Sequence, residues 1–94
     1  MMKSSAALVI ERPERYAKQL ASHIGTRAEV TNENGMSTIR FGFGGVGTIA
    51  TSETSVLLTA EAEDQERLSR IQDVLGSHLL RFSKAAEGTT LAWS

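Results

Sequence analysis

The sequence predicts one α+β domain, a two-layer sandwich in which two helices pack on one face of a mainly antiparallel sheet. Its 94 residues suit a single hydrophobic core, so the whole chain, 1–94, is interpreted as one domain. Two segments carry apolar residues at helical spacing, and between them short apolar runs alternate with turn signals. The predicted order is β-α-β-β-β-β-α-β. Amphipathic helices beside a sheet with one apolar face bury both surfaces by stacking in two layers.

The first two elements are an apolar strand and an amphipathic helix. Residues 5–10 (SAALVI) form an apolar run of strand length. Pro13 suits the first position of a helix, where its missing N–H removes no hydrogen bond. We predict this helix over 13–24, with Gly25 as a left-handed cap after its end. The apolar face of the helix repeats every four residues: Tyr16, Leu20 and Ile24.

The middle of the chain predicts four strands. Asn34-Gly35 is the dipeptide typical of a type I′ hairpin turn, and the polar strand before it is placed near an edge of the sheet. In the strand after it, period-two alternation places Ile39, Phe41 and Phe43 on one face. The four strands are predicted at 27–33, 36–43, 46–52 and 55–61.

A long helix and a closing strand complete the prediction. The helix is expected over 64–82, and acidic residues at its start suit the positive end of the helix dipole. Gly76 interrupts it at a cost of about 1 kcal/mol relative to alanine, which either close packing or plain tolerance explains. Residues 89–93 (TTLAW) read as the last strand. The apolar stripe of the helix is Leu68, Ile71, Leu75, Leu79 and Phe82.

Residues 42–47 (GFGGVG) match the G-x-G-x-x-G pattern of dinucleotide-binding folds letter for letter. In those folds the glycines open a helix whose N-terminus holds the pyrophosphate. Here the following residues, 48–51 (TIAT), are β-branched and strand-like. We therefore interpret the glycines as a turn or bulge between two strands and reject the dinucleotide site.

Composition excludes several classes of function. The net charge of −1 and the pI of about 6.1 argue against a general nucleic-acid binder, which carries a strongly basic face. The absence of cysteine excludes disulfides, thiolate metal sites and cysteine nucleophiles, and fits a cytoplasmic protein. The apolar run near the start is too short to span a bilayer, so no membrane association is expected.

The two histidines are the candidate chemical groups, because imidazole is the side chain best suited to proton transfer near neutral pH. His23 flanks the apolar face of the first helix, and His78 lies beside the stripe of the second. If the helices pack side by side, the two rings approach each other. One reading is a shared metal, proton-transfer or ligand site. The other, favoured here, is two partly buried histidines bonded to backbone carbonyls.

A metal site needs more ligands than these two imidazoles, and no H-x-x-x-H or H-E-x-x-H pattern is present. A homodimer would bring four imidazoles together, although nothing in the sequence requires one. Nucleophilic catalysis has no support either, because Ser77 and His78 are neighbours on a helix and point about 100° apart.

A family resemblance extends over nearly the whole chain. It rests on these residues: Tyr16, Gln19-Leu20, Ser22-His23, 40–44 (RFGFG), 58–61 (LTAE), Asp64, Leu68, Asp73-Val74, His78-Leu79, Arg81-Phe82, Leu91 and Trp93. Together they resemble the bacterial domain of unknown function 2218 family. Both histidines fall at matching positions. After Phe82, residues 83–86 (SKAA) replace the aromatic-Arg-Glu run usual in that family.

The resemblance implies a link to iron. Members of that family are small stand-alone proteins or are joined to siderophore-interacting, flavin-dependent ferric reductases, which makes such a reductase the implied partner. The leading hypothesis is a non-enzymatic binding or accessory module in iron–siderophore metabolism. Its candidate residues are His23 and His78 as metal ligands and Arg81 as a further polar group; no catalytic residue or cofactor is assigned. The alternatives are a small metal-dependent or acid–base enzyme using the same histidines, and a dimerising scaffold with structural histidines.

Overall fold

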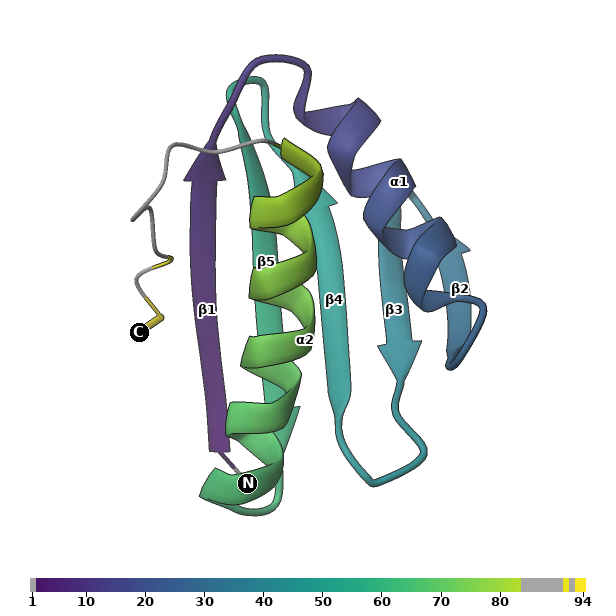
Figure 1. The fold of residues 1–94 in the computed structure, drawn as a ribbon, viewed down its shortest axis with the longest axis vertical. Helices are drawn as coiled ribbons and strands as arrows, with labels where there is room; N and C mark the ends of the chain where they lie inside the picture. Colours follow the sequence, from purple (N-terminus) through teal and green to yellow (C-terminus); the bar gives the residue numbers. More distant parts are fainter. Residues whose placement is uncertain (1, 84–90, 92) are drawn as a thin grey trace.

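The structure, a computed structural model, describes residues 2–83, 91, 93 and 94. Its described part holds a five-stranded antiparallel sheet with both helices on one face (Figure 1), which confirms the α+β two-layer prediction. The strand order in the sheet is β1-β5-β4-β3-β2. The elements are β1 Met2–Val9, α1 Pro13–Ile24, β2 Glu29–Glu33, β3 Met36–Arg40, β4 Val46–Thr51, β5 Ser55–Ala62 and α2 Gln65–Ser83.

Strand β1 begins three residues earlier than the sequence predicts, because its pairing with β5 extends to Met2 opposite Ala62. Its other side contacts the end of the chain. The Ser5 N–H donates to the Ser94 carbonyl (3.0 Å), and the Ser94 N–H donates to the Ser5 carbonyl (2.9 Å). Of the predicted strand 89–93, residues 89, 90 and 92 lie outside the described residues. The side chains of Leu91 and Trp93 are partly buried against the core.

Helix α1 has the bounds that the sequence predicts, with Pro13 at its start. The left-handed cap predicted at Gly25 is wrong, since this residue has φ −59° and ψ −15°. The chain instead continues in a right-handed turn that satisfies the last carbonyls of the helix. The Gly25 N–H donates to Ala21 (2.9 Å), the Thr26 hydroxyl donates to the His23 carbonyl (2.8 Å), and the Ala28 N–H donates to Ile24 (3.0 Å).

The hairpin between β2 and β3 confirms the turn prediction. Asn34 and Gly35 both have positive φ, 51° and 78°, as a type I′ turn requires. Strand β2 has no neighbour on its outer side within the described sheet and is an edge strand, also as predicted.

Strand β3 ends at Arg40, three residues before the predicted end. The alternation of Phe41 and Phe43 continues into a tight loop, in which the Phe41 N–H donates to Gly45 (3.1 Å) and the Gly44 N–H donates to Phe41 (3.0 Å). Gly45 has φ 120°, a conformation that side chains avoid. Strand β4 begins at Val46, directly after these two glycines, so a strand rather than a helix follows them, as the sequence predicts.

The core lies between the helix layer and the inner face of the sheet. Gly76 of α2 belongs to it through close packing, since a Cβ built there would lie 3.2 Å from Leu91 Cδ1. The side chain of Phe82, predicted as the last member of the α2 stripe, lies outside the described residues. Neither α1 nor α2 is long and apolar enough to cross a membrane. The largest fully buried side chains are Leu20, Ile39, Ile49, Leu58, Ile71, Leu75, Leu79 and Val56.

Candidate functional site

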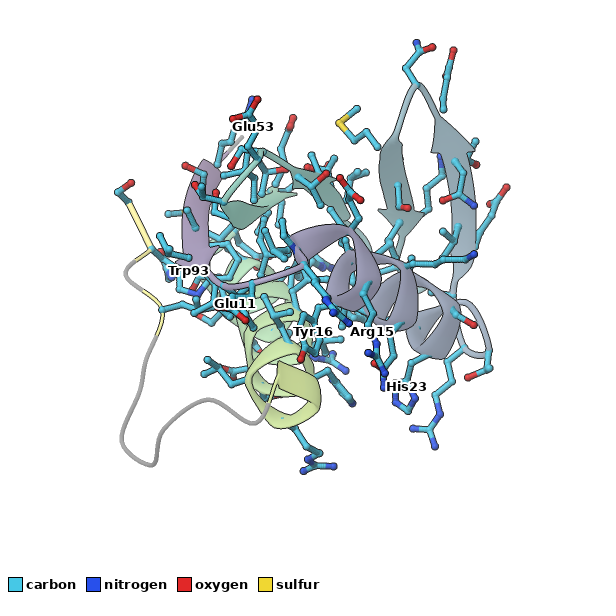
Figure 2. All side chains as sticks on the ribbon, turned by 90° about the horizontal axis from the view of Figure 1, so that it is seen from above. Glu11, Arg15, Tyr16, His23, Glu53 and Trp93 are labelled. Carbon is cyan, nitrogen blue, oxygen red and sulfur yellow. The ribbon has the colours of Figure 1, made fainter. Side chains whose placement is uncertain are left out.

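The two histidines contact each other across the helix pair. Their ring centroids are 4.8 Å apart, and the ring planes are inclined by 42°. His23 lies in the last turn of α1 and is exposed, whereas His78 lies on α2 and is half-buried. Figure 2 shows His23 projecting from the helix layer, away from the sheet. The structure thus brings together the two residues that the sequence singles out.

The ring of His78 is held by its own helix. Its Nδ1 lies 2.7 Å from the Val74 carbonyl oxygen, which can only accept, so Nδ1 carries a proton and donates it. In the neutral ring Nε2 is then the basic nitrogen, and in the protonated ring it is a second N–H donor. The orientation of this imidazole is therefore fixed by the backbone one turn earlier.

A pocket of about 220 Å³ opens beside the histidine pair. It forms where three segments meet: the end of α1 with the turn after it, the β3–β4 loop, and the middle of α2. This volume is smaller than the 300–1,000 Å³ typical of drug-sized ligands, so the pocket suits one ring or one end of a larger molecule. The lining residues are His23, Ile24, Arg27, Ala28, Phe41, Gly42, Phe43, Val74 and His78.

The polar groups of the pocket are all basic. Among the described residues, its lining combines the Arg27 guanidinium and the two imidazoles with no carboxylate. The guanidinium is a permanent positive charge, so the lining favours an anion. Within the residues that the structure describes, no group of three histidine, aspartate, glutamate or cysteine side chains could hold a metal ion. The pair alone is short of the ligand number of a closed zinc site.

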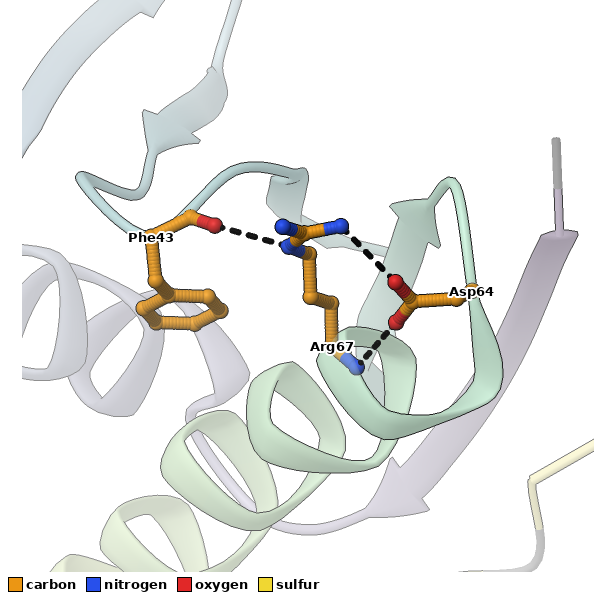
Figure 3. A network of polar contacts seen from close by, with 3 residues as sticks. All are labelled: Phe43, Asp64 and Arg67. Carbon is orange, nitrogen blue, oxygen red and sulfur yellow. Dashed lines mark hydrogen bonds and ion pairs between the residues drawn. The ribbon is translucent and has the colours of Figure 1, made fainter.

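The apolar wall of the pocket is the β3–β4 loop. The rings of Phe41 and Phe43 lie 5.2 Å apart between centroids. Two contacts hold this loop against α2. Arg67 Nε donates to the Phe43 carbonyl (2.9 Å), and Arg70 lies over the Phe43 ring. Arg67 is itself fixed by an ion pair of 2.7 Å to Asp64, whose other oxygen accepts from the Arg67 N–H at the start of α2 (Figure 3).

Two outcomes differ from the sequence-based prediction of the site. Arg81 is exposed in the last turn of α2 and is not among the residues that line the pocket. Arg27 lines it instead, and sequence reasoning missed this residue. The available signal was its spacing: Arg27 follows His23 by four residues, and the right-handed turn through Gly25 carries the helical spacing past the end of α1. Phe41 and Phe43, predicted only as core residues, are partly buried and also line the pocket.

The chain is similar over most of its length to one protein family and to a solved structure. A family model described as "Uncharacterized protein conserved in bacteria (DUF2218)" matches residues 5–94. The NMR structure of PA4090 from Pseudomonas aeruginosa is similar to this chain with a TM-score of 0.84 and 26% sequence identity. That similarity covers 100% of this chain and 96% of PA4090. No curated protein matches the chain.

Proposed function

The chain belongs to the DUF2218 family of bacterial proteins, and from that premise we propose that it is a small binding module whose His23–His78 pocket takes an anionic, aromatic group. The observation that carries the proposal is the contact of the two imidazoles, 4.8 Å apart, at the mouth of a pocket that Arg27 also lines. Three basic groups from two helices and a turn converge on one small volume. An anion held there can accept hydrogen bonds from the Arg27 guanidinium and from imidazole N–H groups.

The shape of the pocket defines the rest of the ligand. Its apolar lining comes from Phe41, Phe43 and Val74, and one benzene-sized ring is known to fit a cavity of about 150 Å³. An aromatic ring with an adjacent carboxylate or phenolate therefore fills the pocket and places its charge beside the histidines. A ring against Phe43 also gains from edge or offset stacking, which contributes about 0.5–1.5 kcal/mol beyond burial.

The iron–siderophore role expected from the family resemblance is consistent with this ligand class. Catecholate siderophores carry aromatic rings whose oxygens are anionic when they bind ferric iron, and such a complex needs no metal ligand from the protein. The histidines then act as donors to the siderophore rather than as ligands to iron. A flavin-dependent siderophore-interacting reductase is the partner that this role implies, and the proposal places the protein as its accessory binding module.

A second candidate is an acid–base enzyme at the same pocket, which the hydrogen bond from His78 Nδ1 to the Val74 carbonyl favours. A histidine that acts as a general base is usually held in position by a second group, and the Val74 carbonyl has that place here. A metal-dependent enzyme would need more metal ligands than the two histidines, and the bound substrate would have to supply them. Either enzyme hypothesis predicts turnover that is lost when the histidines are replaced. The binding-module hypothesis predicts stoichiometric binding without turnover.

The test is an anaerobic calorimetric titration of the protein with four probes: Fe(II), Zn(II), an anionic ferric catecholate and a neutral ferric trihydroxamate. We expect the catecholate to bind at least about tenfold more tightly than the trihydroxamate, a difference of about 1.4 kcal/mol. The folded double variant His23→Ala/His78→Ala should lose that preference. Binding of Fe(II) or Zn(II) alone with loss in the same variant would favour the metal-dependent reading instead.

Two single substitutions distinguish binding in this pocket from attraction by the overall positive charge nearby. A Cβ built at Gly42 meets nothing within 4 Å, so Gly42→Leu should fold normally while adding a bulky side chain at a residue that lines the pocket. It should block binding as strongly as the double histidine variant. Arg81→Ala removes a positive charge outside the pocket and should leave affinity unchanged within about twofold. A catecholate that binds Gly42→Leu as well as wild type would exclude this pocket as its site.

A further inference from the structure

The sheet face turned away from the helices carries an ordered pattern of charges. Both helices lie on one face (Figure 1), and the opposite face is formed by the alternate residues of all five described strands. Following the register across the sheet, one row reads in strand order Lys3, Glu61, Val46, Arg40 and Glu29. Its charges are therefore plus, minus, none, plus and minus, with the uncharged member on the central strand β4.

The next row along the strands is made of hydroxyls. It consists of Ser5, Thr59, Thr48, Thr38 and Thr31, one from each strand. The Thr48 and Thr59 hydroxyls hydrogen-bond to each other within the row. Each hydroxyl both donates and accepts, so this row can pair with an identical row in either direction. Beyond it, Leu57 and Met36 expose 37% and 41% of their surface on the same face.

We infer that this face binds a second copy of the chain, sheet against sheet, about a two-fold axis that runs along β4. Such an axis places β1 of one copy over β2 of the other, and β5 over β3. Lys3 then opposes the second copy's Glu29, and Glu61 opposes its Arg40, so each charge of this row meets its opposite. Val46 and Thr48 meet their own counterparts, and Leu57 meets Met36. A charge row is complementary to itself about such an axis only when its charges reverse sign from one side of β4 to the other, as they do here.

Known sheet packing allows this arrangement. Aligned sheets cross at about 30° with their backbones about 10 Å apart, and the threonines and alanines near the middle of the face permit that approach. The charged row lies toward one end of the face. The crossing angle moves the two sheets apart there, and the long charged side chains can span the added distance. The face measures roughly 450 Å² on each copy from strand spacing and rise, so the total is at the low end of specific interfaces. We therefore expect a weak dimer, with a Kd of about 10–100 µM.

A charge-exchange experiment tests the pairing. Analytical ultracentrifugation of wild type, from about 10 µM to 1 mM, should show dimers that weaken as salt is added. Arg40→Glu places a glutamate opposite the second copy's Glu61, and Glu61→Arg places an arginine opposite its Arg40, so like charges face each other in both variants. Each variant alone should dimerise at least about tenfold more weakly. An equimolar mixture of the two should form a heterodimer with a Kd within about threefold of wild type, because opposite charges again face each other.

Matched controls carry the same charge changes on the helix layer. Lys18→Glu on α1 and Asp73→Arg on α2 are exposed and should leave the Kd unchanged. Circular dichroism of every variant confirms that the monomer is folded. The inference is overturned if wild type stays monomeric at about 1 mM, if the mixture fails to associate when wild type does, or if the helix-layer controls weaken the dimer equally.

Discussion

Arg70 lies over the ring of Phe43, with its guanidinium carbon 4.2 Å from the ring centroid. The arginine lies in the second turn of α2 and is exposed, whereas the phenylalanine is half-buried and forms part of the pocket wall. The contact ties the β3–β4 loop to the helix from the outside. An exposed surface residue thus helps to position a ring that faces the candidate ligand.

We expect Arg70→Gln to lower the free energy of unfolding by about 0.5–1 kcal/mol, the usual contribution of a cation–π contact at an exposed site. Glutamine keeps most of the aliphatic stem and has a similar helix propensity, so the loss reports mainly the cation. Urea denaturation provides the measurement. A variant as stable as wild type would show that the contact contributes nothing to folding.

Gly45→Ala should be strongly destabilising. The residue has φ 120°, and a Cβ there would lie 2.6 Å from Ile71 Cδ1 and 3.0 Å from the Glu61 carbonyl oxygen. Backbone strain and overpacking together predict a loss of about 2–4 kcal/mol. The matched control is Gly42→Ala in the same loop, where the new methyl group meets open space and should change stability by less than about 0.5 kcal/mol.

The contact with Ile71 also predicts a coupling. Ile71→Val removes the Cδ1 atom and should cost about 0.5–1.5 kcal/mol in wild type, because this side chain is fully buried. In the Gly45→Ala background the same change should cost about 1 kcal/mol less, since it relieves the closest approach. A double-mutant cycle by chemical denaturation measures the difference. Strict additivity would mean that the backbone, rather than the side chain, yields to the new methyl group.

Asp64 has two functions that different substitutions separate. One carboxylate oxygen accepts from the Arg67 N–H at the start of α2 (2.8 Å), and the other pairs with the Arg67 guanidinium (2.7 Å). Both side chains are about half exposed, so the ion pair contributes little. Asp64→Asn keeps a capping oxygen and should change stability by less than about 0.5 kcal/mol, whereas Asp64→Ala should cost about 1 kcal/mol. Equal losses in thermal denaturation would contradict this division.

Local signals in the sequence were sufficient for most of the fold. Pro13 and the four-residue apolar repeat define α1 to the residue, and Asn34-Gly35 defines the hairpin. Where a local pattern competed with the surrounding structure, prediction failed. The alternating pattern of apolar residues predicts that β3 continues to Phe43. In the structure β3 ends at Arg40, and Gly44 and Gly45 turn the chain with positive φ. Gly25 is the residue type typical of a left-handed cap, and yet it continues the right-handed turn.

The candidate site was only half predictable. Helical periodicity places His23 and His78 beside the apolar faces, and their contact follows once two helices lie side by side on one sheet. Arg27 was missed because its position depends on the right-handed turn after α1, and the residue types of that turn do not predict this geometry. Arg81 is a candidate because of the family resemblance, but it lies in the exposed last turn of α2 and not in the pocket lining.

The strand order β1-β5-β4-β3-β2 has a consequence for how the chain acquires its structure. Strands β2 to β5 form a meander in which every neighbour in the sheet is also the next strand in sequence, so each pairing closes only a short loop. Strand β1 pairs with β5 across half of the chain and pays a larger loop-closure entropy. We therefore expect the meander to assemble first and β1 to dock last.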